Sequence, residues 1–299
     1  MIFSEISSKL KLSVVVASHN ARQSVGDCLT ALENQCDGNE VEIIVVDNST
    51  DGSAEIIARE FPGCKLIQGT RDNLIPELWG AGIFESQAEL VALTTTHFVP
   101  AKNWIAETIT AHNSNYAGIG GAIENDSKAG AVSWAVYFCR YSAYMLPFQR
   151  AEVDDFAADN ASYKRRDLER VTDTMQNGFW ETFVHREMRK IGMSLALNSS
   201  IVVTHQHSFT LSEFMSQRFW HGRQFGSTRL TNVSPVKRLI LILLSPVIPF
   251  LYVFRISRRV WVKQRNLRQY CVSFPILVLF LLSWSAGEFT GYVWREKER

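Results

Sequence analysis

The sequence lacks several patterns that mark well-known protein classes. No Cys-x-x-Cys pair occurs among its five cysteines, and no Cys/His cluster has the spacing of a zinc finger. No Gly-x-Gly-x-x-Gly segment follows the first apolar run, which disfavours a dinucleotide-dependent oxidoreductase. The odd, scattered set of cysteines indicates reduced thiols, as expected in a reducing compartment.

An excess of charge and an apolar leader are missing too. The 299 residues carry a formal net charge of +1, so the chain as a whole has no strong attraction to nucleic acid. The first residues, MIFSEISSKLKLS, lack the long apolar core of a signal peptide, so we expect residues 1–230 in the cytoplasm. An apolar fraction of 46% and a charged fraction of 20% are typical of a globular protein.

Short apolar runs alternate with helix-period segments in the first 125 residues. Leu12–Ala17 and Val41–Val46 are rich in β-branched residues, as expected for strands buried on both faces. The same pattern predicts further strands at Cys64–Gln68, Glu89–Leu93 and Gly118–Ile123, and helices at Arg22–Gln35, Ser53–Glu60, Leu74–Ser86 and Asn103–His112. This alternation predicts an α/β fold with a mostly parallel sheet flanked by helices.

Polar residues follow three of these strands directly, at Ser18–Asn20, Asp47–Ser53 and Thr94–His97. In open parallel sheets ligands bind beyond the carboxyl ends of the strands, so the three segments are expected to surround one site. Asp51-Gly52 favours a tight turn and Ser53 is a good helix cap, so an ordinary loop explains them. It does not explain Asp47, whose carboxylate can accept hydrogen bonds from a base or a ribose.

VVVASHN at 14–20 and VVDNSTDGS at 45–53 together resemble the family 2 glycosyltransferases of the GT-A fold. That family opens with a strand ending in a polar triplet, followed by a strand that runs into an Asp-rich loop. The similarity continues over most of the chain, in residues 75–86, ELVALTTTHFVPAKNWI at 89–105, ADNASYKRRDL at 158–168, QRFWHGR at 217–223 and AGEFTGYVW at 286–294.

The resemblance implies a glycosyltransferase that takes a nucleotide-sugar as its donor and is typical of polysaccharide biosynthesis. It implies that Asp47 contacts the nucleotide and that Ala17, Ser18 and His19 line the base and ribose pocket. The further donor-side candidates are Arg71 and Thr96.

The metal site of that family is usually an Asp-x-Asp at the end of the fourth strand, where this chain has Thr94-Thr95-Thr96-His97. Hydroxyl groups do not replace the anionic oxygen ligands of a hard cation. Three alternatives stay open. Activity is metal-independent, or catalysis is lost in a relative that binds nucleotide-sugar or glycan, or His97 helps to hold Mn²⁺ or Mg²⁺. If activity is metal-independent, Arg71, Arg218 or Arg223 is expected to balance the negative charge of the phosphates. If His97 helps to hold a metal ion, His205 is a candidate second ligand.

An inverting transferase needs a general base that deprotonates the acceptor hydroxyl. Glu181 occupies the position where the family places an acid at the start of a helix, although the helix dipole alone also favours glutamate there. The family often has two adjacent acids at this place, and this chain has Glu181-Thr182.

The other acceptor-side candidates are Asp159, Asn160, Arg218, Trp220 and Arg223. Helix capping is the alternative for Asp159 and Asn160. A basic helix at a membrane surface is the alternative for the other three, and it is compatible with substrate binding.

Residues 126–232 break the earlier rhythm. Helices are expected at Val132–Met145, Lys164–Arg170, Glu181–Ile191 and Leu211–Arg229, with short strands near Met193–Thr204. Two charge-free apolar runs then follow, Leu239–Phe254 and Tyr270–Ala286, which are close to the lower length limit for crossing a membrane.

The linker between the apolar runs, RISRRVWVKQRNLR at 255–268, carries six cations and no acid. Two full spans would place it outside, against the positive-inside rule, and Pro246 and Pro249 would kink the first span. We therefore favour re-entrant or in-plane helices, while a hairpin of two spans stays open.

Three regions are expected: a nucleotide-sugar-binding half at 1–125, an acceptor-binding half at 126–232, and membrane-associated helices at 233–299. The predicted protein is a membrane-attached transferase whose catalytic domain faces the cytoplasm. Its expected acceptor is membrane-proximal: a lipid-linked sugar, a glycolipid or a polysaccharide.

Overall fold

The computed structural model describes all residues except 1–2, 8, 37–39, 207–208, 231–232 and 295–299. Its contacts divide the chain into two compact units. The first comprises Met1–Glu124 and Leu146–Gln206, and the second comprises Asn125–Met145 and His207–Arg299. The three regions expected from the sequence are defined by substrate rather than by contacts, so they stay predictions.

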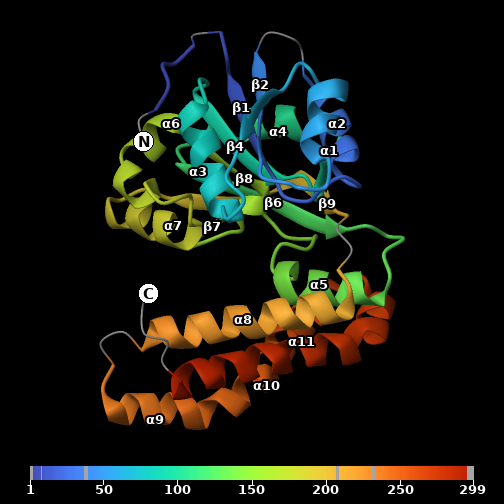
Figure 1. The fold of residues 1–299 in the computed structure, drawn as a ribbon, viewed down its shortest axis with the longest axis vertical. Helices are drawn as coiled ribbons and strands as arrows, with labels where there is room; N and C mark the ends of the chain where they lie inside the picture. The colour runs from blue at the N-terminus through green and yellow to red at the C-terminus, as the bar shows by residue number, and fades with distance from the viewer. Residues whose placement is uncertain (1–2, 8, 37–39, 207–208, 231–232, 295–299) are drawn as a thin grey trace. The chain divides into compact units, whose positions relative to one another are not determined.

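The first unit is built on a nine-stranded sheet with the order β3-β2-β1-β4-β8-β6-β9-β5, and β7 pairs with β9 (Figure 1). Its first half is parallel, because β1 pairs in parallel with both β2 and β4, and β2 pairs in parallel with β3. These strands are β1 (Leu12–Ser18), β2 (Val41–Asp47), β3 (Lys65–Gln68) and β4 (Leu90–Thr95). The side chains of β1 are buried along its whole length, as expected for a central strand.

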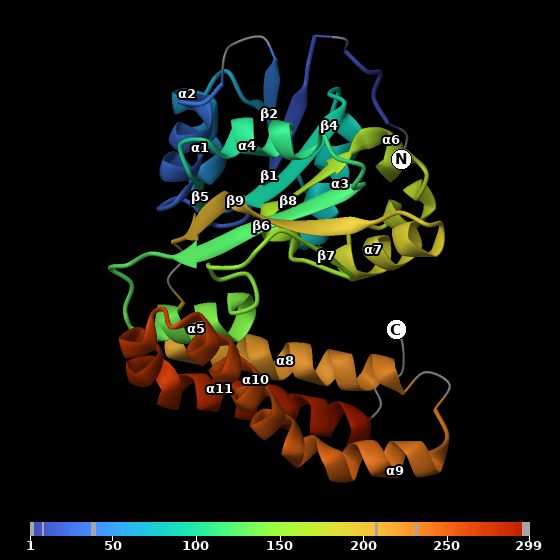
Figure 2. The same cartoon turned by 180° about the vertical axis from the view of Figure 1, so that it is seen from behind.

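The second half of the sheet is antiparallel where β8 pairs with β4 and β6, and where β9 pairs with β5 and β7, as Figure 2 shows from behind. Its strands are β5 (Phe98–Pro100), β6 (Gly118–Asn125), β7 (Ala151–Val153), β8 (Ala161–Lys164) and β9 (Leu195–His205). The insertion of β8 between β4 and β6 brings a segment of the second half of the unit against the parallel strands.

Helices and short 3-10 turns connect and cover these strands (Figure 1). They are α1 (Val25–Glu33), α2 (Ser53–Glu60), α3 (Ile75–Glu85), α4 (Trp104–Ala111), η1 (Ala158–Asn160), α6 (Arg165–Glu169), η2 (Thr172–Met175) and α7 (Glu181–Lys190). The predicted α/β class is confirmed, and most predicted elements lie within a few residues of the observed ones. The expectation of short strands at 193–204 was wrong, because β9 is one continuous strand. The short strands β5, β7 and β8 were not predicted.

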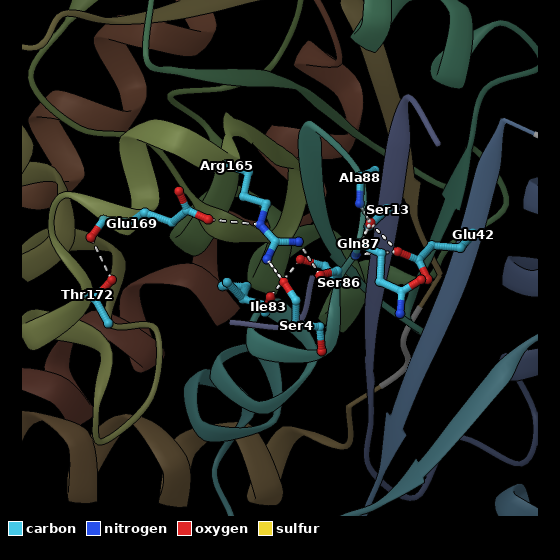
Figure 3. A network of polar contacts seen from close by, with 10 residues as sticks. All are labelled: Ser4, Ser13, Glu42, Ile83, Ser86, Gln87, Ala88, Arg165, Glu169 and Thr172. Atoms are coloured by element: carbon cyan, nitrogen blue, oxygen red, sulfur yellow. Dashed lines mark hydrogen bonds and ion pairs between the residues drawn. The ribbon is translucent and has the colours of Figure 1, made fainter. Parts of the chain in front are cut away.

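A buried arginine joins segments at the amino edge of the sheet, opposite the carboxyl ends of the parallel strands (Figure 3). The Arg165 guanidinium donates to the backbone oxygens of Ser86 and Ser4, and its Nε lies 3.1 Å from Glu169 Oε1. Beside it, Ser13 Oγ donates to Glu42 Oε1 at 2.5 Å and accepts from Ala88 N–H at 3.0 Å. Arg165 thus connects α6 to the end of α3 and to the N-terminal segment.

The second unit is helical. It contains α5 (Ala131–Tyr141), α8 (Leu211–Arg229), α9 (Pro235–Leu244), η3 (Ser245–Val247), α10 (Ile248–Lys263) and α11 (Leu267–Val293). Helices α8 and α11 lie side by side in both views (Figures 1 and 2). A Cβ at Gly222 would collide with the backbone oxygen of Trp284, and one at Gly226 with that of Glu288.

The same close approach exists in the other direction, since Gly287 and Gly291 of α11 face the backbone oxygens of Phe219 and Arg223. The contacting positions rise together along both helices, so α8 and α11 run parallel. Each helix therefore contributes a Gly-x-x-x-Gly pair that lets the two backbones approach closely.

Two stretches of the second unit, Pro235–Lys263 and Leu267–Val293, are long and apolar enough to cross a membrane by length and composition. Only 17% of the apolar window in the first stretch is buried. Its exposed apolar side chains, each at least 46% exposed, are Val236, Leu239, Ile240, Leu243, Leu244, Val247, Phe250, Leu251, Phe254, Trp261 and Val262. The apolar runs expected from the sequence are thus helical, and much of their apolar surface has no cover within the described residues.

Replacing Arg165 by Met should lower the stability of the protein, because it leaves the backbone oxygens of the half-buried Ser4 and the buried Ser86 without their donor. The free energy of unfolding should fall by about 3 kcal/mol. In thermal unfolding in detergent this corresponds to a fall of roughly 5–10 °C in apparent Tm. The matched control is Arg166→Met, since the Arg166 side chain is 77% exposed. Equal Tm values for the two variants would contradict a structural role for Arg165.

Candidate functional site

The loops after β1 and β2 are joined by hydrogen bonds at the carboxyl edge of the sheet. Asn20 has a left-handed backbone with φ of 47°. Its N–H donates to Ser49 Oγ at 2.8 Å, and its side-chain oxygen accepts from Thr50 N–H at 3.0 Å. The polar triplet and the Asp-rich loop predicted to share a site are therefore brought together by direct contacts.

Asp51 makes further hydrogen bonds in this junction of the loops that follow β1 and β2. Its Oδ2 accepts from Arg22 N–H at 3.0 Å, and its Oδ1 accepts from the Ser53 hydroxyl at 2.5 Å and from Ser53 N–H at 3.1 Å. Burial acts to raise the pKa of Asp51, but the hydrogen bonds from Ser53 and Arg22 outweigh it and hold that pKa below its usual range.

Asp47 and Asn48 extend the junction to the loop between β3 and α3. The buried Asp47 carboxylate accepts from Ser49 N–H at 3.1 Å and from Ser49 Oγ at 2.6 Å. Asn48 Oδ1 lies 2.8 Å from His19 Nδ1, and its Nδ2 donates to Asn73 O at 2.8 Å. Arg71 is exposed on this loop, so three loops that carry donor-side candidates meet at one edge.

Two further candidates lie directly beneath these loops. Ala17 is fully buried and offers no polar side chain, and its backbone oxygen accepts from Thr96 N–H at 3.2 Å. Ser18 is also fully buried, and its backbone oxygen accepts from Asn48 N–H at 3.1 Å. Both residues support the edge of the sheet, and only the Ser18 hydroxyl can add a donor to a ligand.

The ends of β1 and β4 carry three buried hydroxyl groups that have no hydrogen-bond partner among the described residues: Ser18 Oγ, Thr94 Oγ1 and Thr96 Oγ1. The parallel register pairs Val16 with Thr94, and strand alternation then puts Ser18, Thr94 and Thr96 on one face. Buried polar groups are almost always satisfied, so these hydroxyls are candidates for hydrogen bonds to a ligand or to ordered water.

The donor set at this place does not fit a divalent cation held by the protein. The described residues contain no group of three or more His, Cys, Asp or Glu side chains that could hold a metal ion. His97 Nδ1 lies 3.3 Å from Ser24 Oγ. His205, the candidate second ligand, is buried on β9 opposite Phe98, with its ring centroid 5.2 Å from that of Phe98.

The start of α7 reaches the same edge by packing on α3. Phe179 N–H donates to Pro76 O at 2.7 Å. Gly178 has φ of 103°, and a Cβ there would lie 2.9 Å from the Glu77 backbone, so this approach needs glycine. The first residue of α7 is Glu181, which is half-buried.

A carboxylate that the sequence analysis missed also lies at the start of α7. Asp155 Oδ2 accepts from Thr182 Oγ1 at 3.0 Å, and Asp155 Oδ1 lies 2.5 Å from His185 Nδ1. Burial acts to raise the pKa of Asp155, but its hydrogen bonds with His185 and Thr182 keep that pKa below its usual range. The available signal was the acid-rich Asp154-Asp155 pair before residues 158–168, but only the fold places it beside residue 182.

The acceptor-side candidates differ in their surroundings. Asn160 is buried, and its side chain accepts from Trp104 Nε1 at 2.9 Å and donates to the backbone oxygens of Ala122 and Ile201 at 2.8 and 3.1 Å. The preceding Asp159 is half-buried in η1, which contacts β4. Asn160 therefore connects η1, β6 and β9. Contact of Asp159 and Asn160 with an acceptor stays a prediction.

The remaining candidates, Arg218, Trp220 and Arg223, belong to α8 in the second unit. The Arg218 guanidinium lies 5.0 Å from the ring centroid of Trp284, and burial lowers the pKa of Arg218. Arg223 lies 5.3 Å from the Trp220 ring centroid, and Trp220 is 54% exposed. Their participation in the site of the first unit stays a prediction.

The family described as glycosyl transferase family 2 matches residues 13–172, more than half of the chain. The match runs from β1 to the first residue of η2 and ends before α7, so Glu181 lies beyond the matched segment. A comparison with curated proteins finds no match.

Three solved structures are similar to this chain at low sequence identity, and one of them has a TM-score above 0.5. The mannosyltransferase PcManGT from Pyrobaculum calidifontis, in complex with GDP-Man and Mn²⁺, is 12% identical with a TM-score of 0.56, over 96% of this chain and 89% of that one. TarS from S. aureus is 15% identical with a TM-score of 0.48, and the match covers 79% of this chain but only 43% of TarS. A fragment of TarS, residues 1–349, is 14% identical with a TM-score of 0.49, over 95% of this chain and 89% of the fragment.

Replacing Asp51 by Asn should destabilise the protein in a pH-dependent way. Because the folded pKa of Asp51 lies below its unfolded value, its charge stabilises the fold above the unfolded pKa, and this contribution is lost as pH falls through the folded pKa. The apparent Tm of Asp51→Asn should be lower than that of the wild type at pH 7, and the difference should shrink below about pH 4. A Tm difference that is constant with pH would contradict this assignment.

Proposed function

The chain belongs to glycosyl transferase family 2 and is a glycosyltransferase, and from this premise we propose that it moves a sugar from a nucleotide-sugar to a membrane-proximal acceptor. The observation that supports the donor side is the junction of three polar loops at the carboxyl ends of β1, β2 and β3. This is the edge where ligands of open α/β sheets bind.

The nucleotide is proposed to bind at this junction. Asp47 offers its carboxylate as an acceptor to a base or ribose, and the Ser49 hydroxyl orients that carboxylate by donating to it. His19 lies on the neighbouring loop, fixed by Asn48. The diphosphate then faces the hydroxyls of Ser18 and Thr96, and the exposed Arg71 supplies positive charge.

Donor binding is proposed to need no divalent cation. Thr94 and Thr96 offer neutral hydroxyl groups where a hard cation prefers anionic oxygen ligands. A neutral hydroxyl can still donate a hydrogen bond to a phosphate oxygen, and a guanidinium can balance its charge. No step of the proposed reaction passes through a metal ion.

The transfer is proposed to invert the configuration of the sugar. Glu181 acts as the general base, and it accepts the proton of the acceptor hydroxyl while the acceptor oxygen attacks the anomeric carbon. The bond from that carbon to the diphosphate breaks, and its electron pair leaves with the nucleoside diphosphate. The position of Glu181 beside the amino end of α3 supports this role, since that end adjoins the Arg71 loop.

The second unit is proposed to attach the protein to the cytoplasmic face of a membrane by helices that lie in the plane of the bilayer. The exposed apolar side chains of α9 and α10 support attachment. The pairing of α11 with α8, which carries Arg218, Arg223 and Arg229, favours an in-plane position because charged groups avoid the bilayer centre. An acceptor close to the bilayer follows: a lipid-linked sugar, a glycolipid or a growing polysaccharide.

Nucleotide-sugar binding can be tested by titrating the purified protein with a panel of UDP-, GDP- and dTDP-sugars, with Mn²⁺ or with EDTA. One or more donors should bind equally well in both conditions. Asp47→Ala should weaken that binding at least about 10-fold, because it removes a charged hydrogen-bond acceptor. Asp72→Ala, which removes an exposed acid from the Arg71 loop, is the control and should bind like the wild type.

Hydrolysis of the donor is measured in the same tubes, with a membrane lipid extract supplied as acceptor. Binding without turnover under every condition would favour a catalytically impaired relative that only binds the donor. The absence of binding to any donor would contradict both readings. Binding that requires Mn²⁺ would contradict metal independence alone.

Membrane attachment can be tested with vesicles of phosphatidylcholine and phosphatidylglycerol. Phe250 and Phe254 are 71% and 66% exposed on α10. Replacing both by Asp should reduce co-sedimentation with vesicles at least about 10-fold, since each buried phenyl group is worth roughly 1.5–3 kcal/mol. The control is Phe183→Asp, which changes an exposed phenyl group of the first unit. Equal losses in the two variants would count against attachment through α10.

A further inference from the structure

Helices α5 and α8 of the second unit bring three basic side chains together: Arg140, Arg218 and His221, which we name the basic cluster. Arg218 Nη2 donates to His221 Nδ1 at 3.1 Å. Burial and the charges of Arg218 and Arg140 lower the pKa of His221 to about 4, so its ring is neutral at pH 7. Since Nδ1 accepts from Arg218, the neutral ring carries its hydrogen on Nε2 and can donate it to a ligand.

The Arg218 guanidinium packs against aromatic rings instead of an acid. Its Cζ lies 5.0 Å from the ring centroid of Trp284 on α11 and 5.2 Å from that of Phe214. Its Nε is buried and has no hydrogen-bond partner within the described part of the chain. Burial lowers the pKa of Arg218 and the charge of Arg140 lowers it further, and none of the described groups that act on it is a carboxylate.

Two other arginines of the protein show that an acid could have been supplied. Arg229, on the same helix, lies 3.4 Å from Glu288 Oε1 of α11, and the buried Arg165 lies 3.1 Å from Glu169 Oε1. Removing a charge from water without a counter-charge is costly. Arg218 carries this cost among the described residues, so an anion from outside the chain would stabilise it.

The basic cluster is accessible from solvent and lies beside exposed aromatic groups. Arg140 and His221 are exposed, and Arg218 is half-buried. On the same helix Trp220 is 54% exposed and Phe225 is 44% exposed. Exposed aromatic rings next to basic side chains are typical of protein surfaces at the level of lipid head groups. This setting favours a lipid over a freely dissolved anion as the ligand.

We propose that the basic cluster binds the phosphate of a lipid whose phosphate is a monoester. Arg140 and Arg218 offer forked guanidinium groups to one ligand, and such forks match the geometry of phosphate oxygens. A phosphomonoester suits them because it has three oxygens and more than one negative charge at pH 7. His221 adds a neutral donor through its Nε2–H.

This site rests on the proposed membrane attachment and goes beyond it. The attachment relies on exposed apolar side chains of α9 and α10, which do not distinguish one head group from another. The basic cluster adds recognition of one head group by α5 and α8. A lipid of this kind would therefore be bound at a fixed place on the second unit, in addition to the general attraction of basic residues to an anionic bilayer.

Head-group selectivity tests the site on the full chain. The purified protein is floated with phosphatidylcholine vesicles that contain either phosphatidic acid or phosphatidylserine, at compositions adjusted to the same zeta potential. Both bilayers then attract basic residues alike, but only phosphatidic acid presents an uncovered monoester. Half-maximal binding should need about 5–10-fold less lipid with phosphatidic acid than with phosphatidylserine.

Variants of the basic cluster should remove this preference. Arg218→Gln and Arg140→Gln should each bring the ratio of the two half-maximal lipid concentrations close to 1. Because Arg140 is exposed, Arg140→Gln keeps the test valid if the loss of Arg218 unfolds the protein. The control is Arg258→Gln, which removes an exposed cation from α10 and should weaken binding to both vesicles while keeping the wild-type ratio.

The possible failures can be told apart. A wild-type ratio of 1, or a preference that survives in Arg140→Gln and in a folded Arg218→Gln, would overturn the lipid site and leave membrane attachment intact. Loss of the preference in excess inorganic phosphate or nucleoside diphosphate would assign the basic cluster to a soluble anion and would also overturn it. Binding to neither kind of vesicle would overturn the proposed attachment and this inference with it.

Discussion

Parallel pairing of β1 with β2 and with β4 is the constraint on which the site depends. In-register pairing of Ser18 with Asp47, and of Ala17 with Thr95, makes all three strands end at the same edge. Their loops must then satisfy their own backbone groups without further strand partners, and they do so with each other, through Asn20, Ser49 and Asp51. Loop-to-loop hydrogen bonds therefore hold the loops together at this edge.

The parallel half of the fold and the donor loops could be predicted because their signals are local. Buried β-branched runs followed at once by polar residues identify β1 and β2. The GT-A-type fold that the family resemblance implies is confirmed by the family match and by the fold shared with one solved structure. The unusual composition of Thr94–His97 could also be recognised from the sequence, because these residues stand where the family usually has an Asp-x-Asp motif.

The contacts around the start of α7 could not be predicted to the same depth, because they join residues far apart in the chain. Asp155 and Thr182 are separated by 27 positions, and no local pattern connects them. The strand β8 is only four residues long, and its place between β4 and β6 is set by tertiary pairing. Asn160 was predicted to contact the acceptor because its segment resembles the family. In the structure its side chain donates to the backbone oxygens of Ala122 and Ile201.

The glycine contacts between α8 and α11 have a consequence for how this protein can change over evolutionary time. Four glycines on two helices each face a backbone oxygen of the other helix, so no side-chain atoms separate the helices at those positions. A methyl group at Gly222 or Gly287 cannot be absorbed by a rotamer change, since backbone stands in its way. Substitution there requires the whole helix pair to move apart, whereas the outward faces of both helices can vary freely. Relatives that keep this helix pair are therefore expected to share its four small residues even where the rest of the second unit has diverged.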